Sequence, residues 1–147
     1  MNINIVCAGK LKEAYLRDAA AEYVKRLSRY CRIRITEVED GPDMHAEAER
    51  ILKKLNPSSY IITLEIMGTE VSSEELSDKL KKLGVNGISD ITFIIGGSDG
   101  LDNRIISLAR EHISFSRLTF THQIMRVLLL EQIYRSFKIM SGEPYHK

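Results

Sequence analysis

The chain has little that would signal a metal centre or a disulfide framework. It contains only two cysteines, Cys7 and Cys31, and neither has a Cys or His partner at a metal-ligand spacing. Two such thiols argue against both kinds of site, so we expect both to be structural. The histidines show no ligand spacing either, and we expect no metal. These histidines are His45, His112, His122 and His146.

An excess of one charge and a long apolar run are also missing. Lys and Arg number 21 against 20 Asp and Glu, so the chain as a whole exerts no general attraction on nucleic acid. Its first ten residues lack the basic and apolar segments of a signal peptide, and no stretch approaches the length of a membrane span. We therefore expect no membrane partner and a cytoplasmic location.

Signatures of hydrolysis and of phosphate binding are absent too. No Gly-x-Ser-x-Gly motif occurs, and no Ser or Cys has a neighbour that marks it as a nucleophile. The glycine-rich stretch Gly96–Gly100 reads Gly-Gly-Ser-Asp-Gly, which matches neither the dinucleotide fingerprint nor the phosphate loop. The sequence therefore does not predict that this loop binds phosphate.

What the chain does contain is an ordinary globular composition with alternating strand and helix patterns. It has 147 residues, 44% of them apolar and 28% charged, which predicts one domain over residues 1–147. The alternation predicts an α/β fold with a mostly parallel sheet flanked by helices. The predicted strands are Ile3–Ala8, Ile33–Val38, Tyr60–Glu65, Ile91–Ile95 and Ser116–Phe120. The predicted helices are Leu11–Leu27, Ala46–Leu55, a segment from the Ser72–Glu75 capping box to Gly84, Leu101–Arg110 and Gln123–Lys138.

Three loops fall at or beside the carboxyl ends of predicted strands. They are Leu64–Gly68, Gly96–Gly100 and Phe115–Phe120. In open α/β sheets ligands bind at that edge, and glycine lets a backbone approach a ligand closely. The loops are mostly apolar, without a cluster of carboxylates or cations, which favours a flat neutral ring such as adenine. The alternative is three unrelated turns, the glycine loop being a plain strand-to-helix connection.

A local basic segment stands out against the neutral total. Five basic residues and no acidic one lie between positions 25 and 34, together with Tyr30. Such a segment can hold a phosphate backbone even when the net charge is near zero. A solvated helix end explains it equally well, because helix carboxyl termini favour cations. The basic residues are Lys25, Arg26, Arg29, Arg32 and Arg34.

Several motifs together resemble one known family. Leu118–Arg135 reads Leu-Thr-Phe-Thr-His-Gln-Ile-Met-Arg-Val-Leu-Leu-Leu-Glu-Gln-Ile-Tyr-Arg, and the chain ends in Pro-Tyr-His-Lys. With the glycine loop and the opening Val6–Lys12, these motifs closely resemble the RlmH family over the whole length. Members of this family are large-subunit ribosomal RNA pseudouridine N3-methyltransferases of the SPOUT superfamily.

The resemblance implies a fold, a cofactor and partners. It implies a carboxyl-terminal trefoil knot, an exception to the rule that protein chains avoid knots. It also implies S-adenosyl-L-methionine bound within the knot, a homodimer with the site at its interface, and a stem-loop of 23S ribosomal RNA in the assembled ribosome as substrate. The residues that match the family's cofactor-contacting motifs are Leu64, Gly96, Phe115, Ser116, Arg117, Leu118, Thr119 and Phe120.

The chemistry expected from the resemblance is direct attack of pseudouridine N3 on the sulfonium methyl group. The imide proton must be removed or the anion stabilised, and Tyr145, His146 and Arg135 are the candidates for handling it. Thr121 stands where the family usually has proline, and we expect Thr to cap the following helix without a change of function. The alternatives are a non-catalytic ribosome-binding or assembly protein with a SPOUT fold and an ordinary doubly wound nucleotide-binding enzyme.

Overall fold

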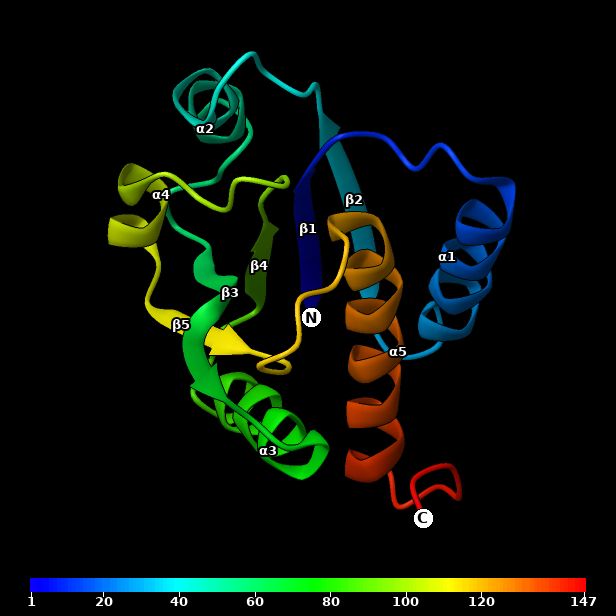
Figure 1. The fold of residues 1–147 in the computed structure, drawn as a ribbon. Coiled ribbons are helices and arrows are strands. Elements are labelled where there is room, and N and C mark those ends of the chain that lie inside the picture. Colours follow the sequence, from blue (N-terminus) through cyan, green and yellow to red (C-terminus); the bar gives the residue numbers. More distant parts are fainter.

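A computed structural model describes residues 1–147 and shows five strands alternating with five helices (Figure 1). The strands are β1 (Asn2–Ala8), β2 (Arg32–Val38), β3 (Tyr60–Glu70), β4 (Asp90–Ile95) and β5 (Glu111–Ser114). The helices are α1 (Ala14–Leu27), α2 (Met44–Leu52), α3 (Ser73–Val85), α4 (Asn103–Leu108) and α5 (His122–Met140). No helix has the length and apolarity that crossing a membrane requires.

The strands form a single sheet in the order β2-β1-β4-β3-β5, and every pair is parallel. The prediction of a parallel sheet flanked by helices is therefore confirmed. The central strand β4 is buried along Ile91–Ile95, as its unbroken apolar run predicts for a strand covered on both faces. Because all strands point the same way, their carboxyl ends meet at one edge of the sheet.

Helices cover both faces of the sheet. On one face α1, α3 and α5 pack against side chains such as Ile5 and Phe93, and on the other α2 and α4 pack against Val6 and Ile94. Figure 1 shows α5 between α1 and α3. Apolar residues occupy most of the circumference of α5, which is typical of a helix with neighbours on several sides.

Two predicted segments differ from the observed ones. The strand predicted at Ser116–Phe120 is wrong, because β5 ends at Ser114 and the later residues form bends and irregular loop. Alternation of apolar and polar residues imitates a strand there, whereas Ile113 is the only large apolar residue of β5. The third strand also extends beyond Glu65, through a shift in register, and pairs again with β5 at Thr69 and Glu70. The predicted Leu64–Gly68 loop is therefore part of a strand.

Helix caps agree with the residues that the sequence offers. The Ser72 hydroxyl accepts a hydrogen bond of 3.1 Å from the Glu75 amide, and the Glu75 carboxylate accepts one of 2.7 Å from the Ser72 amide. This is the predicted capping box. Thr121 caps α5, since its Oγ1 accepts a 3.2 Å hydrogen bond from the Ile124 amide. The prediction that Thr121 caps this helix is confirmed.

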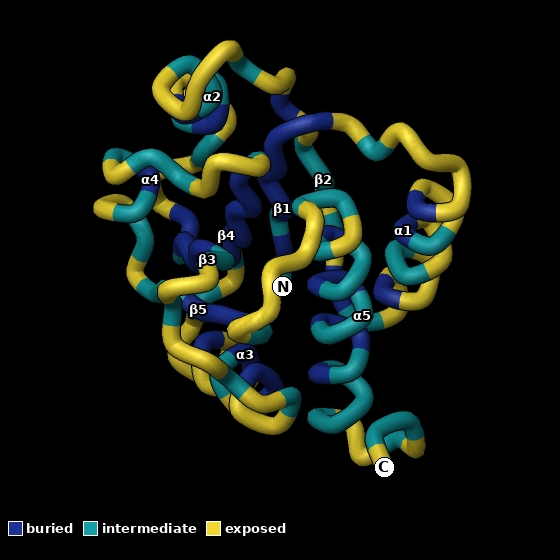
Figure 2. Tube along the Cα trace, viewed as in Figure 1, coloured by how far each residue is buried: buried dark blue, intermediate teal, exposed yellow.

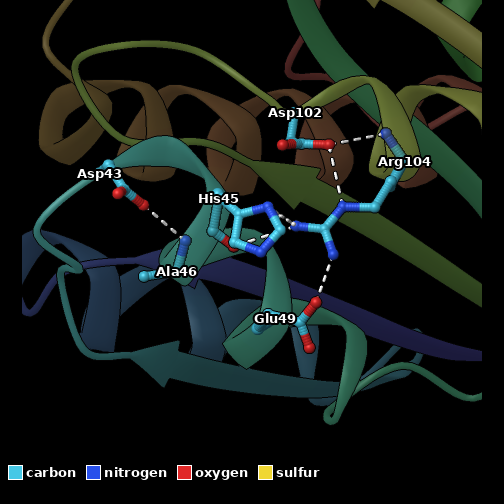
Figure 3. Close-up of polar contacts among 6 residues, drawn as sticks. All are labelled: Asp43, His45, Ala46, Glu49, Asp102 and Arg104. Atoms are coloured by element: carbon cyan, nitrogen blue, oxygen red, sulfur yellow. Dashed lines mark hydrogen bonds and ion pairs between the residues drawn. The ribbon is translucent and has the colours of Figure 1, made fainter.

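An arginine fastens α2 to α4, the two short helices beside the glycine loop (Figure 3). Arg104 forms an ion pair with Glu49 of α2 and donates a 3.0 Å hydrogen bond from Nη2 to the carbonyl of His45. Its backbone amide also donates a 2.9 Å bond to Asp102 Oδ1, the N-cap of α4. These contacts fix the two helices that flank the end of β4.

Candidate active site

The structure brings two of the predicted cofactor residues, Leu64 and Gly96, close together on adjacent strands. Leu64 pairs with Ile95 of β4 on one side and with Ile113 of β5 on the other. Gly96 follows Ile95 directly, and Phe115 follows one residue after the end of β5. Gly96 and Phe115 therefore leave the sheet at its carboxyl edge, where parallel sheets place their ligands, whereas Leu64 lies within β3 at the point where its register shifts.

Two residues of the glycine loop have to be glycine because the loop turns tightly. A Cβ atom at Gly96 would lie 2.7 Å from the carbonyl oxygen of Gly100, and Gly100 itself has a φ of +85°. An α2 side chain holds the loop from outside, since the Gly97 amide donates a 3.0 Å hydrogen bond to Glu47 Oε1. The turn leaves backbone, rather than side chains, at the end of β4.

The connection from β5 to α5 is ordered by serines and carries exposed apolar side chains. Ser114 Oγ donates a 2.9 Å hydrogen bond to the Ser116 carbonyl, and Ser116 Oγ accepts one of 2.9 Å from the Leu118 amide. The Leu118 residue is 69% exposed and Phe120 is 37% exposed. Figure 2 shows most of this connection as exposed. Large apolar side chains that are exposed together in one loop indicate a ligand-binding or protein-binding surface.

A cavity of about 240 Å³ opens beside this connection, between α3 and α5. Phe115, Ser116 and Phe120 line it, but Leu64 and Gly96 do not. Most of the lining is apolar or hydroxyl-bearing, without a charged side chain. Its other lining residues are Val71, Ser72, Ser73, Leu76, Leu128 and Gln132.

The predicted catalytic residues lie together, in a second group at the far end of α5. Glu131 accepts hydrogen bonds from Arg135 Nη2 at 2.8 Å and from the Tyr145 hydroxyl at 3.0 Å. The Arg135 guanidinium also lies over the Tyr145 ring, 4.7 Å from its centroid. His146 completes the group, with Nδ1 3.1 Å from Arg135 Nη1 and Nε2 2.6 Å from Glu74 Oε1.

The contacts of the tail fix the protonation of two of its side chains. Arginine can only donate, so His146 Nδ1 accepts from Arg135 and Nε2 donates its proton to Glu74. Burial and hydrogen bonds with Tyr23 and Glu131 raise the pKa of the Tyr145 phenol above its ordinary value, so Tyr145 is a neutral donor. In this arrangement His146 has no free ring lone pair, and the Tyr145 hydroxyl gives its proton to a hydrogen bond with Glu131.

Within one chain the tail does not line the cavity, although residues of α3 and α5 contact the one and line the other. Gln132, which lines the cavity, follows Glu131 and accepts a 2.7 Å hydrogen bond from Ser73 Oγ. Glu74, the neighbour of Ser73, is the partner of His146. The two residues that hold the tail, Glu131 and Glu74, are thus the immediate sequence neighbours of two that line the cavity.

Sequence analysis missed a buried arginine that supports the edge. Arg126 is 1% exposed and donates hydrogen bonds to Glu37 Oε2 at 2.6 Å and to the Gly9 carbonyl at 2.9 Å. Its Nε has no partner. A single charge within the apolar run Ile124–Leu130 was the signal available, because a charge is buried only when it is paired.

No group of three or more His, Cys, Asp or Glu side chains is close enough to hold a metal ion. Both cysteines are buried and free, and burial raises the pKa of each thiol to about 11. Neither thiol is a nucleophile at neutral pH.

Two relatives align with the chain over its whole length. Ribosomal RNA large subunit methyltransferases H of Bifidobacterium animalis subsp. lactis (strain AD011) and of Clostridium kluyveri (strain ATCC 8527) are each 49% identical, over 160 and 159 aligned residues. Both alignments cover 100% of this chain and 100% of the relative.

Solved structures share the fold at low sequence identity. The tRNA (m1G37) methyltransferase from Aquifex aeolicus matches with a TM-score of 0.57 at 12% identity, covering 92% of this chain and 70% of that one. A probable methylase family protein from Haemophilus influenzae Rd KW20 gives a TM-score of 0.61 at 16% identity, covering 99% and 70%. The family model described as "Predicted SPOUT methyltransferase" matches residues 1–146. With that match and the relatives at 49% identity, the chain belongs to the SPOUT methyltransferase family.

Proposed function

We propose that this protein transfers a methyl group from S-adenosyl-L-methionine to N3 of a pseudouridine in large-subunit ribosomal RNA. The substrate is a stem-loop of 23S RNA in the assembled ribosome, and the reaction takes place in the cytoplasm. The observation that carries the proposal is the end-to-end identity of 49% with enzymes named for methylation of that RNA.

The cofactor site in this proposal is the carboxyl edge of the sheet. Leu64, Gly96 and the Phe115–Phe120 connection suit an adenosyl group, because they offer backbone polar groups and apolar side chains, with Arg117 as the one charged residue of the connection. The exposed Leu118 and Phe120 would gain cover from such a ligand. The individual contacts proposed for Phe115, Ser116, Arg117 and Thr119 follow from their place in the same motif.

The bound cofactor supplies an electrophilic methyl group, and the side chains of the chain position the RNA base and manage its proton. In the proposed reaction N3 gains the methyl group and loses its imide proton. His146 can accept that proton only after Nδ1 leaves Arg135, which frees a lone pair. Arg135 is then available to stabilise the developing anion, and Tyr145 to donate a hydrogen bond. The structure supports these roles by placing the three side chains together.

A homodimer would join the two groups of site residues, with the tail of one subunit close to the cavity of its partner. An outward-facing apolar strip on α5 and the preceding connection supports this pairing, since Ile124 is 40% exposed and Phe120 37% exposed. The trefoil knot belongs to the same proposal. Its support is the fold shared with other SPOUT proteins.

The experiment that tests the proposal is mass spectrometry of ribosomal RNA after incubation of ribosomes with the protein and a methyl donor carrying an isotopic label. Ribosomes from cells that lack the modification serve as substrate. We expect one labelled methyl group on one pseudouridine of the large-subunit RNA. Saturable binding of the donor without any labelled RNA would contradict the proposed reaction. A protein that binds ribosomes but not the donor would be an assembly factor.

A further inference from the structure

Four basic side chains around the start of β2 have no acidic partner. Of the five between positions 25 and 34, only Arg26 forms an ion pair, with Glu22 at 3.0 Å. The other four are exposed. We call them the basic surface: Lys25, Arg29, Arg32 and Arg34. Elsewhere in the molecule most arginines are engaged, as Arg104, Arg126 and Arg135 illustrate.

Neither of two common structural reasons accounts for the whole basic surface. The carboxyl end of α1 attracts cations, which explains Lys25 and Arg29 but not residues on a strand. Charge on an edge strand discourages association of sheets, which explains Arg32 and Arg34 but not the helix end. The two explanations concern different elements, yet Arg29 beyond the helix end and Arg32 of the strand line one concavity.

The geometry of this region suits a chain of phosphates. Arg32 and Arg34 are two residues apart in β2, so their side chains lie on the same face of the sheet. Arg29 lies over the Tyr30 ring, 5.9 Å from its centroid. Arg29, Tyr30 and Arg32 also line a concavity of about 440 Å³ together with the polar side chains of Asn2 and Ser28. Guanidinium groups, an aromatic ring and hydrogen-bond donors around a hollow are the features that hold an RNA backbone.

The basic surface is continuous with the tail that carries the proposed catalytic side chains. The Tyr30 hydroxyl donates a 2.7 Å hydrogen bond to Glu143, which also pairs with Lys138 at 2.7 Å. Two residues further along the chain, Tyr145 packs against Tyr134 with ring centroids 4.9 Å apart. A backbone held at Arg29 and Arg32 would therefore run beside the tail.

We propose that the basic surface is where the phosphate backbone of the RNA substrate docks. This inference rests on the proposed function, because it names the face that meets the RNA. With a net charge of +1 the protein lacks a general attraction for RNA, so its electrostatic affinity comes from a local group of unpaired cations. Each phosphate contact releases a counterion, which makes the binding sensitive to salt.

The test compares two triple variants that remove the same charge. Arg29→Gln/Arg32→Gln/Arg34→Gln changes the basic surface, and Lys53→Gln/Lys54→Gln/Lys81→Gln changes exposed lysines without ion pairs on other elements. Filter binding measures the association of each with ribosomes and with naked 23S RNA over a range of KCl concentrations. Calorimetry with S-adenosyl-L-methionine verifies that each variant keeps the wild-type cofactor affinity.

We expect the basic-surface variant to bind RNA about tenfold or more weakly at low salt, with the slope of log affinity against log salt reduced by about 2. The lysine variant should bind like the wild type. Equal affinities and slopes for the two variants would overturn the inference. So would a defect seen with ribosomes but not with naked RNA, since that result identifies an acidic protein as the partner.

Methyl transfer, measured in parallel, separates the inference from the proposed function. Wild-type protein that binds RNA through the basic surface but transfers no methyl group refutes the reaction and keeps the docking surface. Wild-type protein that methylates ribosomes while the basic-surface variant binds and reacts equally well refutes the docking surface and keeps the reaction.

Discussion

The guanidinium of Arg126, on α5, donates a 2.9 Å hydrogen bond from Nη2 to the carbonyl oxygen of Gly9, immediately after β1. The same side chain reaches Glu37, which in turn accepts a 2.9 Å hydrogen bond from the Leu11 amide. One buried cation thus joins the start of α5 to the ends of two strands. Because the Phe115–Phe120 connection leads into α5, the same contacts fix one end of the proposed cofactor site.

We expect Arg126→Ala to reduce the free energy of unfolding by about 2–4 kcal/mol. It removes two charge-assisted hydrogen bonds and leaves a cavity, although partial exposure of Glu37 moderates the cost. Urea unfolding measures the change, with Arg104→Ala as a matched control at a more exposed arginine, for which a much smaller loss is expected. Equal losses for the two variants would show that burial of Arg126 adds nothing.

Gly96→Ala should weaken the binding of S-adenosyl-L-methionine on the order of tenfold or more. The added methyl group meets the Gly100 carbonyl at 2.7 Å, so the backbone of the loop has to move away from the proposed site. Calorimetry gives the affinity. Gly87→Ala is the control, because Gly87 has a φ of +82° and open space around it, far from the strand carboxyl ends. Unchanged affinity in Gly96→Ala would place the cofactor elsewhere.

Replacing His146 or Tyr145 by Ala should abolish methyl transfer and leave cofactor affinity intact, because both lie in the tail and not in the cofactor loops. Tyr145→Phe keeps the ring that packs on Tyr134 and removes only the donor to Glu131. Single-turnover rates and calorimetry on the same preparations separate chemistry from binding. Unchanged turnover in both alanine variants would refute the role of the tail.

Acid should remove one contribution to the stability of the tail. Hydrogen bonds from Lys138 and Tyr30 hold the pKa of Glu143 below its ordinary value of 4.5. A carboxyl whose pKa is lower in the folded state stabilises the fold above the unfolded pKa, and this contribution is lost as the pH falls through the folded value. Glu143→Gln should therefore be less stable than the wild type at pH 7 and equally stable below the folded pKa. A difference that persists at pH 2 would contradict this assignment.

The architecture was predictable from the sequence where the residues of an element determine its structure by themselves. The apolar run of β4 fitted a strand covered on both faces better than a helix, and the Ser72–Glu75 capping box marked the start of α3. Edge strand β5 was misplaced because its pairing depends on β3, which is distant in the sequence, and not on its own four residues. Local alternation at Ser116–Phe120 was a stronger pattern than the true strand.

The site was predictable in part for the same reason. Strand patterns reveal which residues share an edge, and Leu64 does pair with Ile95, the residue before Gly96, on the adjacent strand. No local pattern gives the partners of Arg126, which come from β1 and β2, or the folding of the tail back onto Glu131 and Glu74. Those contacts depend on how α5 crosses the sheet.

The most direct test of the whole account is a crystal structure of the protein with S-adenosyl-L-homocysteine. The account predicts the adenine ring among Leu64, Gly96 and Leu118, with the sulfur atom directed toward an open face beside a tail carrying Tyr145 and His146. A ligand bound at any other edge of the sheet, with those three residues in contact only with protein and water, would contradict it.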